Sequence, residues 1–144
     1  GSRFSPGAFG VLYIADNEQT ALLEVKHHQN MYWSQVDGMN YDRFVFRALK
    51  CAFNDTDMMS ASALPCNDPI YDSDDYSASH SLGHALRQAG KPGLQYNSVR
   101  SLGSLCWALF TPLPVHSIVQ TSHYEMIWNG SIISTNRITN IQLP

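Results

Sequence analysis

The chain has 144 residues, of which 44% are apolar, and this is enough for one hydrophobic core and a single domain over residues 1–144. The 9 basic and 12 acidic residues give a formal net charge of −3 without a long run of either sign. This balance argues against nucleic acid or an anionic membrane surface as the main partner. No apolar run approaches the ~20 residues that a membrane-spanning helix needs, so we expect a soluble domain.

The N-terminal residues and the cysteines indicate how the chain was produced and in which cellular compartment it acts. Gly1-Ser2 is typical of a cleavage scar, and we therefore expect the domain to have been cut from a longer chain. The three cysteines, Cys51, Cys66 and Cys106, are widely spaced and form no CxxC or zinc-ligand pattern. We interpret them as free thiols in a reducing compartment, and we expect the protein to act in the cytoplasm.

The N-terminal half predicts a strand followed by a helix. Residues 10–15 form a short apolar run that is closed by Asp16-Asn17, which fits a buried strand leading to a helix start. Asp16 or Asn17 can serve as the N-cap. Apolar residues then recur at helical spacing, and we expect the helix to continue to about Tyr32.

A strand over 43–50 and a second helix are expected next. Residues 54–75 are polar and rich in turn formers, which predicts a long loop or a set of short turns. A helix over 76–89 follows, with Asp74 or Asp75 as its N-cap and Gly90 just past its C-terminus.

The C-terminal half predicts mainly antiparallel strands, because short apolar segments alternate with turn formers. A tight turn is expected at Asn129-Gly130. The expected fold class is therefore α+β. The segments expected to be extended are 93–96, 105–110, 117–120, 124–128 and 131–134.

Four residues have side chains suited to a nucleotide. The planar guanidinium of Arg3 can bind a phosphate through two parallel hydrogen bonds, and Ser98 follows a predicted strand, where its hydroxyl and N–H can bond phosphate. Glu24 lies beside the apolar stripe of the first helix, where a carboxylate can bond a sugar hydroxyl or stabilise positive charge on a ribose. Tyr13 can stack on a flat heterocycle.

Each of these residues also has an ordinary structural interpretation. Arg3 can be a solvated surface arginine, Glu24 a solvated helix residue and Ser98 a turn serine. Tyr13, at the centre of a strand, can be a core residue. Spacing alone leaves both interpretations open.

The histidines do not predict a metal site. His80 and His84 are four residues apart on the second helix, but no acidic residue lies between them and no third ligand is evident. His27-His28 likewise has no evident third ligand, and for His28 we expect a ring that packs and hydrogen-bonds near the end of the first helix. We expect no bound metal.

Several short motifs, in order along nearly the whole chain, resemble the RES-domain family, which is named for an arginine, a glutamate and a serine. Asn97 stands where a proline is common in the family, and the chain begins almost at the arginine. The segments that resemble the family are 3–7, 11–15, 21–25, 69–72, 82–87, 93–100, 107–110 and 128–130.

The resemblance implies a fold and an activity. The implied fold is similar to that of ADP-ribosyltransferase toxins, a mixed, mainly antiparallel sheet with flanking helices. The implied substrate is NAD, whose nicotinamide–ribose bond is cleaved by phosphorolysis with inorganic phosphate or by hydrolysis. Arg3, Glu24 and Ser98 are then the expected catalytic residues, and these three with Tyr13 the expected NAD-binding residues.

The resemblance also implies protein partners, and two alternative functions stay open. A toxin that degrades NAD needs restraint in its producer, so a neutralising antitoxin or immunity protein is expected, and the domain is compatible with delivery as part of a secreted effector. One alternative is a mono-ADP-ribosyltransferase that modifies a protein. The other is a non-catalytic module that binds a protein partner through its aromatic residues, 11% of the chain.

Overall fold

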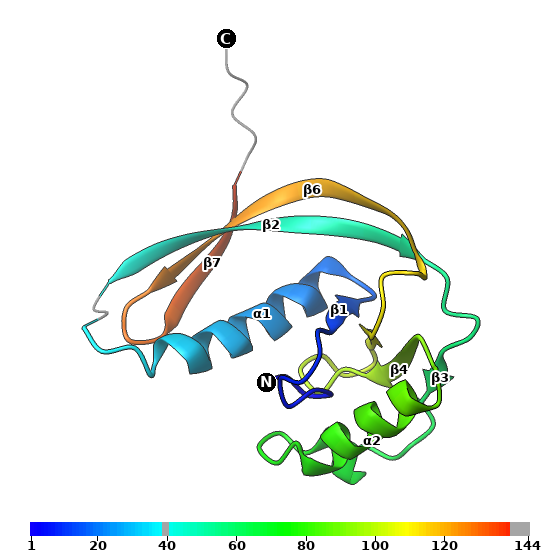
Figure 1. Ribbon diagram of the computed structural model, residues 1–144. Helices are drawn as coiled ribbons and strands as arrows, with labels where there is room; N and C mark the ends of the chain where they lie inside the picture. The colour runs from blue at the N-terminus through cyan, green and yellow to red at the C-terminus, as the bar shows by residue number, and fades with distance from the viewer. Residues whose placement is uncertain (39–40, 139–144) are drawn as a thin grey trace.

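The computed structural model describes residues 1–38 and 41–138 of the chain (Figure 1). The predicted α+β class is confirmed, because helices and strands are interspersed along these residues. In chain order the elements are β1 (Leu12–Ala15), α1 (Glu18–Trp33), β2 (Asp42–Phe53), β3 (Met59–Ser60), the 3-10 turn η1 (Pro69–Tyr71), α2 (Ser77–Gln88), β4 (Gly93–Asn97), β5 (Leu105–Leu109), β6 (Val115–Trp128) and β7 (Ile132–Ile138).

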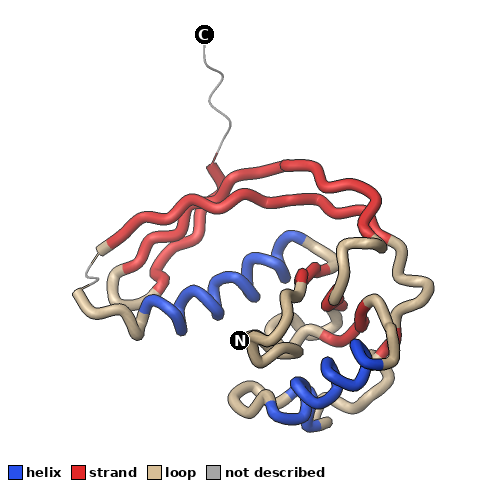
Figure 2. The backbone as a smooth tube through the Cα atoms, viewed as in Figure 1, coloured by secondary structure: helices blue, strands red, loops and turns tan. Residues whose placement is uncertain are grey.

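The strands form two separate sheets. The first has the order β1-β5-β4-β3, and the second the order β2-β6-β7. The described pairings are antiparallel except that of β3 with β4. Figure 2 shows the second sheet as a long arch over α1, while the first sheet lies with α2 on the other side of that helix. The helix α1 therefore lies between the two sheets.

Each sheet has its own cluster of buried apolar residues. The first cluster is built around Phe4, Leu86 and Leu94 and fills the space between the first sheet, the N-terminal segment and α2. The second joins the end of α1 to the arch, where the rings of Trp33 and Phe44 are stacked with centroids 3.8 Å apart. The first sheet is thus packed against α2, and the second sheet is packed against α1.

The start of α1 follows the sequence pattern. Asn17 is the N-cap, and its side-chain oxygen accepts a hydrogen bond from the backbone N–H of Thr20 at 2.8 Å. The helix ends at Trp33, one residue beyond the prediction. The carboxylate of Asp16, the other candidate cap, instead accepts a hydrogen bond from the N–H of Leu105, which ties the helix start to β5.

Three expectations were wrong in detail. The strand β1 is not buried, since Leu12 and Tyr13 are 44% and 37% exposed at the edge of the first sheet. Neither Asp74 nor Asp75 is the N-cap of α2, because that position is Tyr76, which makes no side-chain cap bond. The two strands expected over 117–128 form the single strand β6, because long pairing with β2 bridges the polar residues between them.

Other expectations for the C-terminal half and the loop are confirmed. The chain turns tightly between β6 and β7, where Gly130 has a φ of 78°. Gly90, with a φ of 75°, follows the end of α2. The segment 54–75 is mostly turns, with β3 and η1 within it. Neither α1 nor α2 is long and apolar enough to cross a membrane.

The N-terminal segment is fixed by close contact with α2. A Cβ atom added at Gly83 would lie 2.2 Å from the carbonyl oxygen of Phe4, which is shorter than any normal contact. The ring of Phe4 is fully buried and meets Tyr96 edge-on. Glycine is therefore required at position 83 for the segment that carries Arg3 to lie against the helix.

We expect Gly83→Ala to destabilise the protein by about 1–3 kcal/mol, the usual effect of overpacking. This is opposite to the stabilisation of about 1 kcal/mol that alanine normally gives in a helix. Urea denaturation of the variant measures the free energy of unfolding. Ser81→Ala, an exposed change on the same helix, is the control and is expected to have little effect. A Gly83→Ala protein as stable as the wild type would contradict the close packing.

The three cysteines are expected to differ in reactivity. Cys66 is exposed, Cys51 is partly buried and Cys106 is 2% exposed, and burial raises the pKa of Cys106 to about 12. We expect iodoacetamide at pH 8 to alkylate Cys66 first, Cys51 more slowly and Cys106 only after unfolding, because the thiolate is the nucleophile. Mass spectrometry of the digested protein follows each site. If Cys106 in the folded protein reacted as fast as Cys66, its position in the core would be refuted.

Candidate functional site

A hydrogen bond joins two of the predicted site residues, Glu24 of α1 and Ser98 at the end of β4. The hydroxyl of Ser98 donates to Oε1 of Glu24 at 3.2 Å. The same hydroxyl oxygen accepts hydrogen bonds from the backbone N–H groups of Arg100 at 3.2 Å and Ser101 at 3.1 Å. Because two donors already occupy the oxygen, its proton is directed at the carboxylate. Ser98 therefore holds Glu24 in place.

The turn that carries Ser98 is attached to α1 at a second point. Residues 98–104 close on themselves, since the N–H of Ser98 donates to the carbonyl of Ser104 at 2.9 Å. The buried hydroxyl of Thr20 donates to the hydroxyl of Ser104 at 2.9 Å. Thr20 and Glu24 are four residues apart and so lie on one face of α1. Both contacts fix this face of the helix against the turn.

His28, which lies next to Glu24 on α1, does not form an ion pair with it near pH 7. Nε2 of His28 lies 3.9 Å from Oε2 of Glu24, which is too long for a hydrogen bond. Burial lowers the pKa of His28 and outweighs the opposite effect of the Glu24 carboxylate. His28 is therefore neutral near pH 7, and the pair is not an ion pair there. The charge of Glu24 remains available to a ligand.

Arg3 is buried and held by the loop before α2. Its Nη1 donates to the carbonyl oxygens of Ile70 at 3.0 Å and Asp72 at 2.9 Å, and its guanidinium lies 4.7 Å above the ring centre of Tyr76. Only 7% of the residue is exposed. Arg3 therefore fixes the N-terminal segment to the loop and is not the solvated surface arginine that its sequence context allowed.

Tyr13 supports the same segment from the other side. Its hydroxyl accepts a hydrogen bond from the N–H of Phe4 at 3.0 Å and donates to the hydroxyl of Ser2 at 2.7 Å. Arg3 and Tyr13 are thus connected through the backbone of Phe4. Burial raises the pKa of Tyr13, which keeps the phenol protonated.

Tyr96 is adjacent to both pairs, because its ring packs edge-on against Phe4, whose N–H bonds Tyr13, and it lies two residues before Ser98. Burial raises the pKa of Tyr96 well above the ordinary value, and the charges of Glu24 and Arg3 shift that pKa in opposite directions. We use the term Glu24 cluster for this group, which consists of Arg3, Tyr13, Glu24, His27, His28, Tyr96, Ser98 and Arg100.

Four members of the Glu24 cluster, namely His27, His28, Tyr96 and Arg100, were not predicted as site residues from the sequence. His27 lies three residues after Glu24 and so on a neighbouring part of the same helix face. Arg100 and Tyr96 flank Ser98 at two residues on either side. The only signal for these four was their spacing from a predicted residue, which has little weight without the turn over 98–104 that lies against α1.

Asn97 occupies the position at which proline is common in the family, and its hydrogen bonds show the effect of this difference. Its backbone N–H donates to the hydroxyl of Tyr71 at 3.1 Å, and its side-chain amide donates to the carbonyl of Ser62 at 2.8 Å. Proline has no N–H and could not make the first bond. Asn97 therefore connects the end of β4 to the loop before α2, while Ser98 keeps its own bonds.

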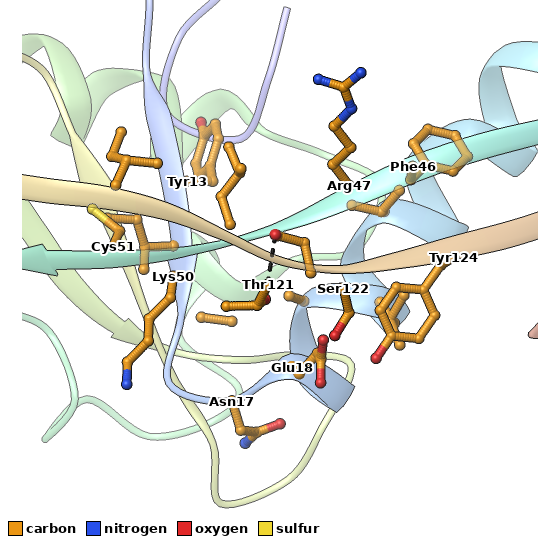
Figure 3. A pocket seen from close by; sticks show the side chains of 18 of the residues that line it. Tyr13, Asn17, Glu18, Phe46, Arg47, Lys50, Cys51, Thr121, Ser122 and Tyr124 are labelled. Carbon is orange, nitrogen blue, oxygen red and sulfur yellow. Dashed lines mark hydrogen bonds between the residues drawn. The ribbon is translucent and has the colours of Figure 1, made fainter. Parts of the chain in front are cut away.

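A large cavity lies on the opposite face of α1 and is separate from the Glu24–Ser98 contact. It has a volume of about 830 Å³ and is enclosed by β1, α1 and the arch of β2 and β6. Figure 3 shows Tyr13, Arg47, Lys50 and Tyr124 around it. Of the four predicted site residues, only Tyr13 lines this cavity. We place the candidate site at the Glu24 cluster because the charged and hydrogen-bonded groups converge there.

The described residues contain no group of three or more His, Cys, Asp or Glu side chains that could hold a metal ion. Nε2 of His80 instead lies 2.7 Å from the carbonyl oxygen of Ser2, which identifies this nitrogen as a donor. That contact adds to the fixation of the N-terminal segment.

Comparison with known proteins identifies the family. No curated protein matches the chain. A protein family described as the RES domain matches residues 1–129, and this range contains every member of the Glu24 cluster. The family is commonly an NAD-related toxin–antitoxin domain. The match covers most of the 144 residues and agrees with the order of the motifs, so this chain belongs to the RES domain family.

Proposed function

We propose that the protein cleaves the nicotinamide–ribose bond of NAD and releases nicotinamide. The observation that supports this most directly is the Glu24 carboxylate, which Ser98 holds from one side and which has no protonated partner near pH 7. A fixed carboxylate of this kind suits a reaction in which positive charge develops on a ribose.

The chemistry needs little acid catalysis. When the bond between the ribose C1″ and the nicotinamide nitrogen breaks, its electron pair leaves with nicotinamide, which departs neutral. The remaining ribose is an oxocarbenium-like cation. Glu24 stabilises it by charge and by accepting hydrogen bonds from the ribose hydroxyls. An oxygen of water or of inorganic phosphate then bonds to C1″, and with water a proton is released to solvent.

The other predicted residues have supporting roles in this proposal. Nη1 of Arg3 is occupied by two carbonyls, while its remaining nitrogens have no hydrogen-bond partner among the described residues and can face the substrate. Tyr13 presents a ring at the edge of the first sheet, 37% exposed, on which nicotinamide can stack. Ser98 acts by positioning Glu24.

Incubation with NAD tests the reaction and its acceptor. We expect nicotinamide to be released, and the same incubation with and without inorganic phosphate identifies the acceptor. Phosphorolysis gives ADP-ribose 1″-phosphate and a rate that rises with phosphate, whereas hydrolysis gives ADP-ribose at a rate independent of phosphate. Chromatography with mass spectrometry distinguishes these products, and label from NAD that remained on protein would instead indicate a transferase. Unchanged NAD with a folded protein would contradict the proposal.

Glu24→Gln is expected to lower turnover about 10²- to 10³-fold, the usual effect of removing one preorganised electrostatic group. The amide keeps the size of the side chain and can still accept the Ser98 bond, so the melting temperature should change little. Glu18→Gln is the matched control, because Glu18 is on the same helix but lines the large cavity. Full activity of Glu24→Gln, or loss of activity in Glu18→Gln alone, would move the site to that cavity.

A further inference from the structure

Arg100 is a half-buried cation that forms no ion pair within the part of the chain that the structure describes. Its backbone N–H bonds Ser98, but its guanidinium makes no hydrogen bond or ion pair within the described residues. Nε of Arg100 is buried and has no partner. A guanidinium in this situation is costly, because buried charges in proteins are normally paired and hydrogen-bonded. Arg100 is thus the member of the Glu24 cluster whose bonding is least complete.

A second unpartnered group lies beside it. Nε2 of His27 is likewise buried without a hydrogen-bond partner. Burial lowers the pKa of His27, and the Arg100 charge lowers it further. His27 is therefore neutral near pH 7 and can offer an N–H without carrying a charge. The two side chains come from different elements, α1 and the turn over 98–104. His27 lies three residues after Glu24, which accepts a hydrogen bond from the Ser98 hydroxyl. That hydroxyl accepts one from the N–H of Arg100, so the two elements meet here.

We propose that Arg100 and His27 form an anion subsite that binds a phosphate group next to Glu24. The inference rests on the proposed function and deepens it, because it assigns the phosphate contact to side chains outside the four predicted residues. A guanidinium with free N–H groups suits phosphate oxygens, and the neutral imidazole adds a donor.

Arg3 and Ser98 are the other candidates for the phosphate contact, and the hydrogen bonds that they already make favour Arg100 and His27. Nη1 of Arg3 is occupied by the carbonyls of Ile70 and Asp72, and the Ser98 hydroxyl by Glu24 and two N–H groups. Among the described residues, no guanidinium nitrogen of Arg100 has a hydrogen-bond partner and neither does Nε2 of His27, whereas Arg3 has only its other two nitrogens left.

The phosphate group can belong to the pyrophosphate of NAD or to inorganic phosphate as acceptor, and binding measurements separate these sources. We would titrate wild type, Arg100→Gln and Arg47→Gln with ADP-ribose, adenosine and inorganic phosphate by calorimetry. Arg47 is the matched control, because its loss removes the same charge from the large cavity on the other face of α1 (Figure 3).

We expect Arg100→Gln to weaken ADP-ribose binding about 10- to 100-fold, the effect of one charge-assisted hydrogen bond, and to leave adenosine binding and the melting temperature unchanged. The salt dependence of ADP-ribose affinity should also be smaller in this variant. Weakened ADP-ribose binding assigns the subsite to the pyrophosphate, and weakened phosphate binding alone assigns it to the acceptor. His27→Phe should weaken the same ligand by a smaller factor.

Two results would overturn the subsite. One is an Arg100→Gln protein that binds ADP-ribose and phosphate as tightly as wild type, and the other is an equal loss in Arg47→Gln, which would indicate a general charge effect. The test does not depend on turnover. If wild type left NAD intact while Arg100→Gln lost ADP-ribose binding, the subsite would stand and the proposed reaction would fail.

Discussion

The hydrogen bond from the Ser98 hydroxyl to Glu24 is the contact on which the arrangement of the site depends. It joins a helix near the N-terminus to a turn 74 residues later in the chain. The turn is bonded internally and to Thr20, so the carboxylate is fixed by a rigid support. A group held in this way stabilises developing charge without reorganising during the reaction.

The N-terminal segment depends on a second set of contacts. The hydroxyl of Tyr13, the carbonyls that accept from Arg3, and Gly83 of α2 fix residues 2–5 from three directions. These contacts fix Arg3 in place, and the hydrogen bonds of its guanidinium to Ile70 and Asp72 are structural. Arg3 and Ser98 therefore share one property, since each is a predicted site residue whose first role in the structure is to position others.

Both faces of α1 are used, which explains why its sequence is hard to interpret. One face carries Leu22 and Val25 toward the arch and the large cavity, and the other carries Thr20 and Glu24 toward the first sheet. A helix between two sheets has no simple solvent face, so polar residues on it can be buried and functional. Glu24 beside an apolar stripe was the only sign of this in the sequence.

The sequence by itself determined the α+β class, both helices, most of the strands and the family, because capping residues, helical spacing and turn formers are local signals that act within a few residues. It did not determine that β1 is an exposed edge strand, that β6 is continuous, or that the turn with Ser98 and Arg100 is bonded to α1. Those features arise from pairing and packing between segments far apart in the chain, and only the tertiary structure decides which distant residues become neighbours.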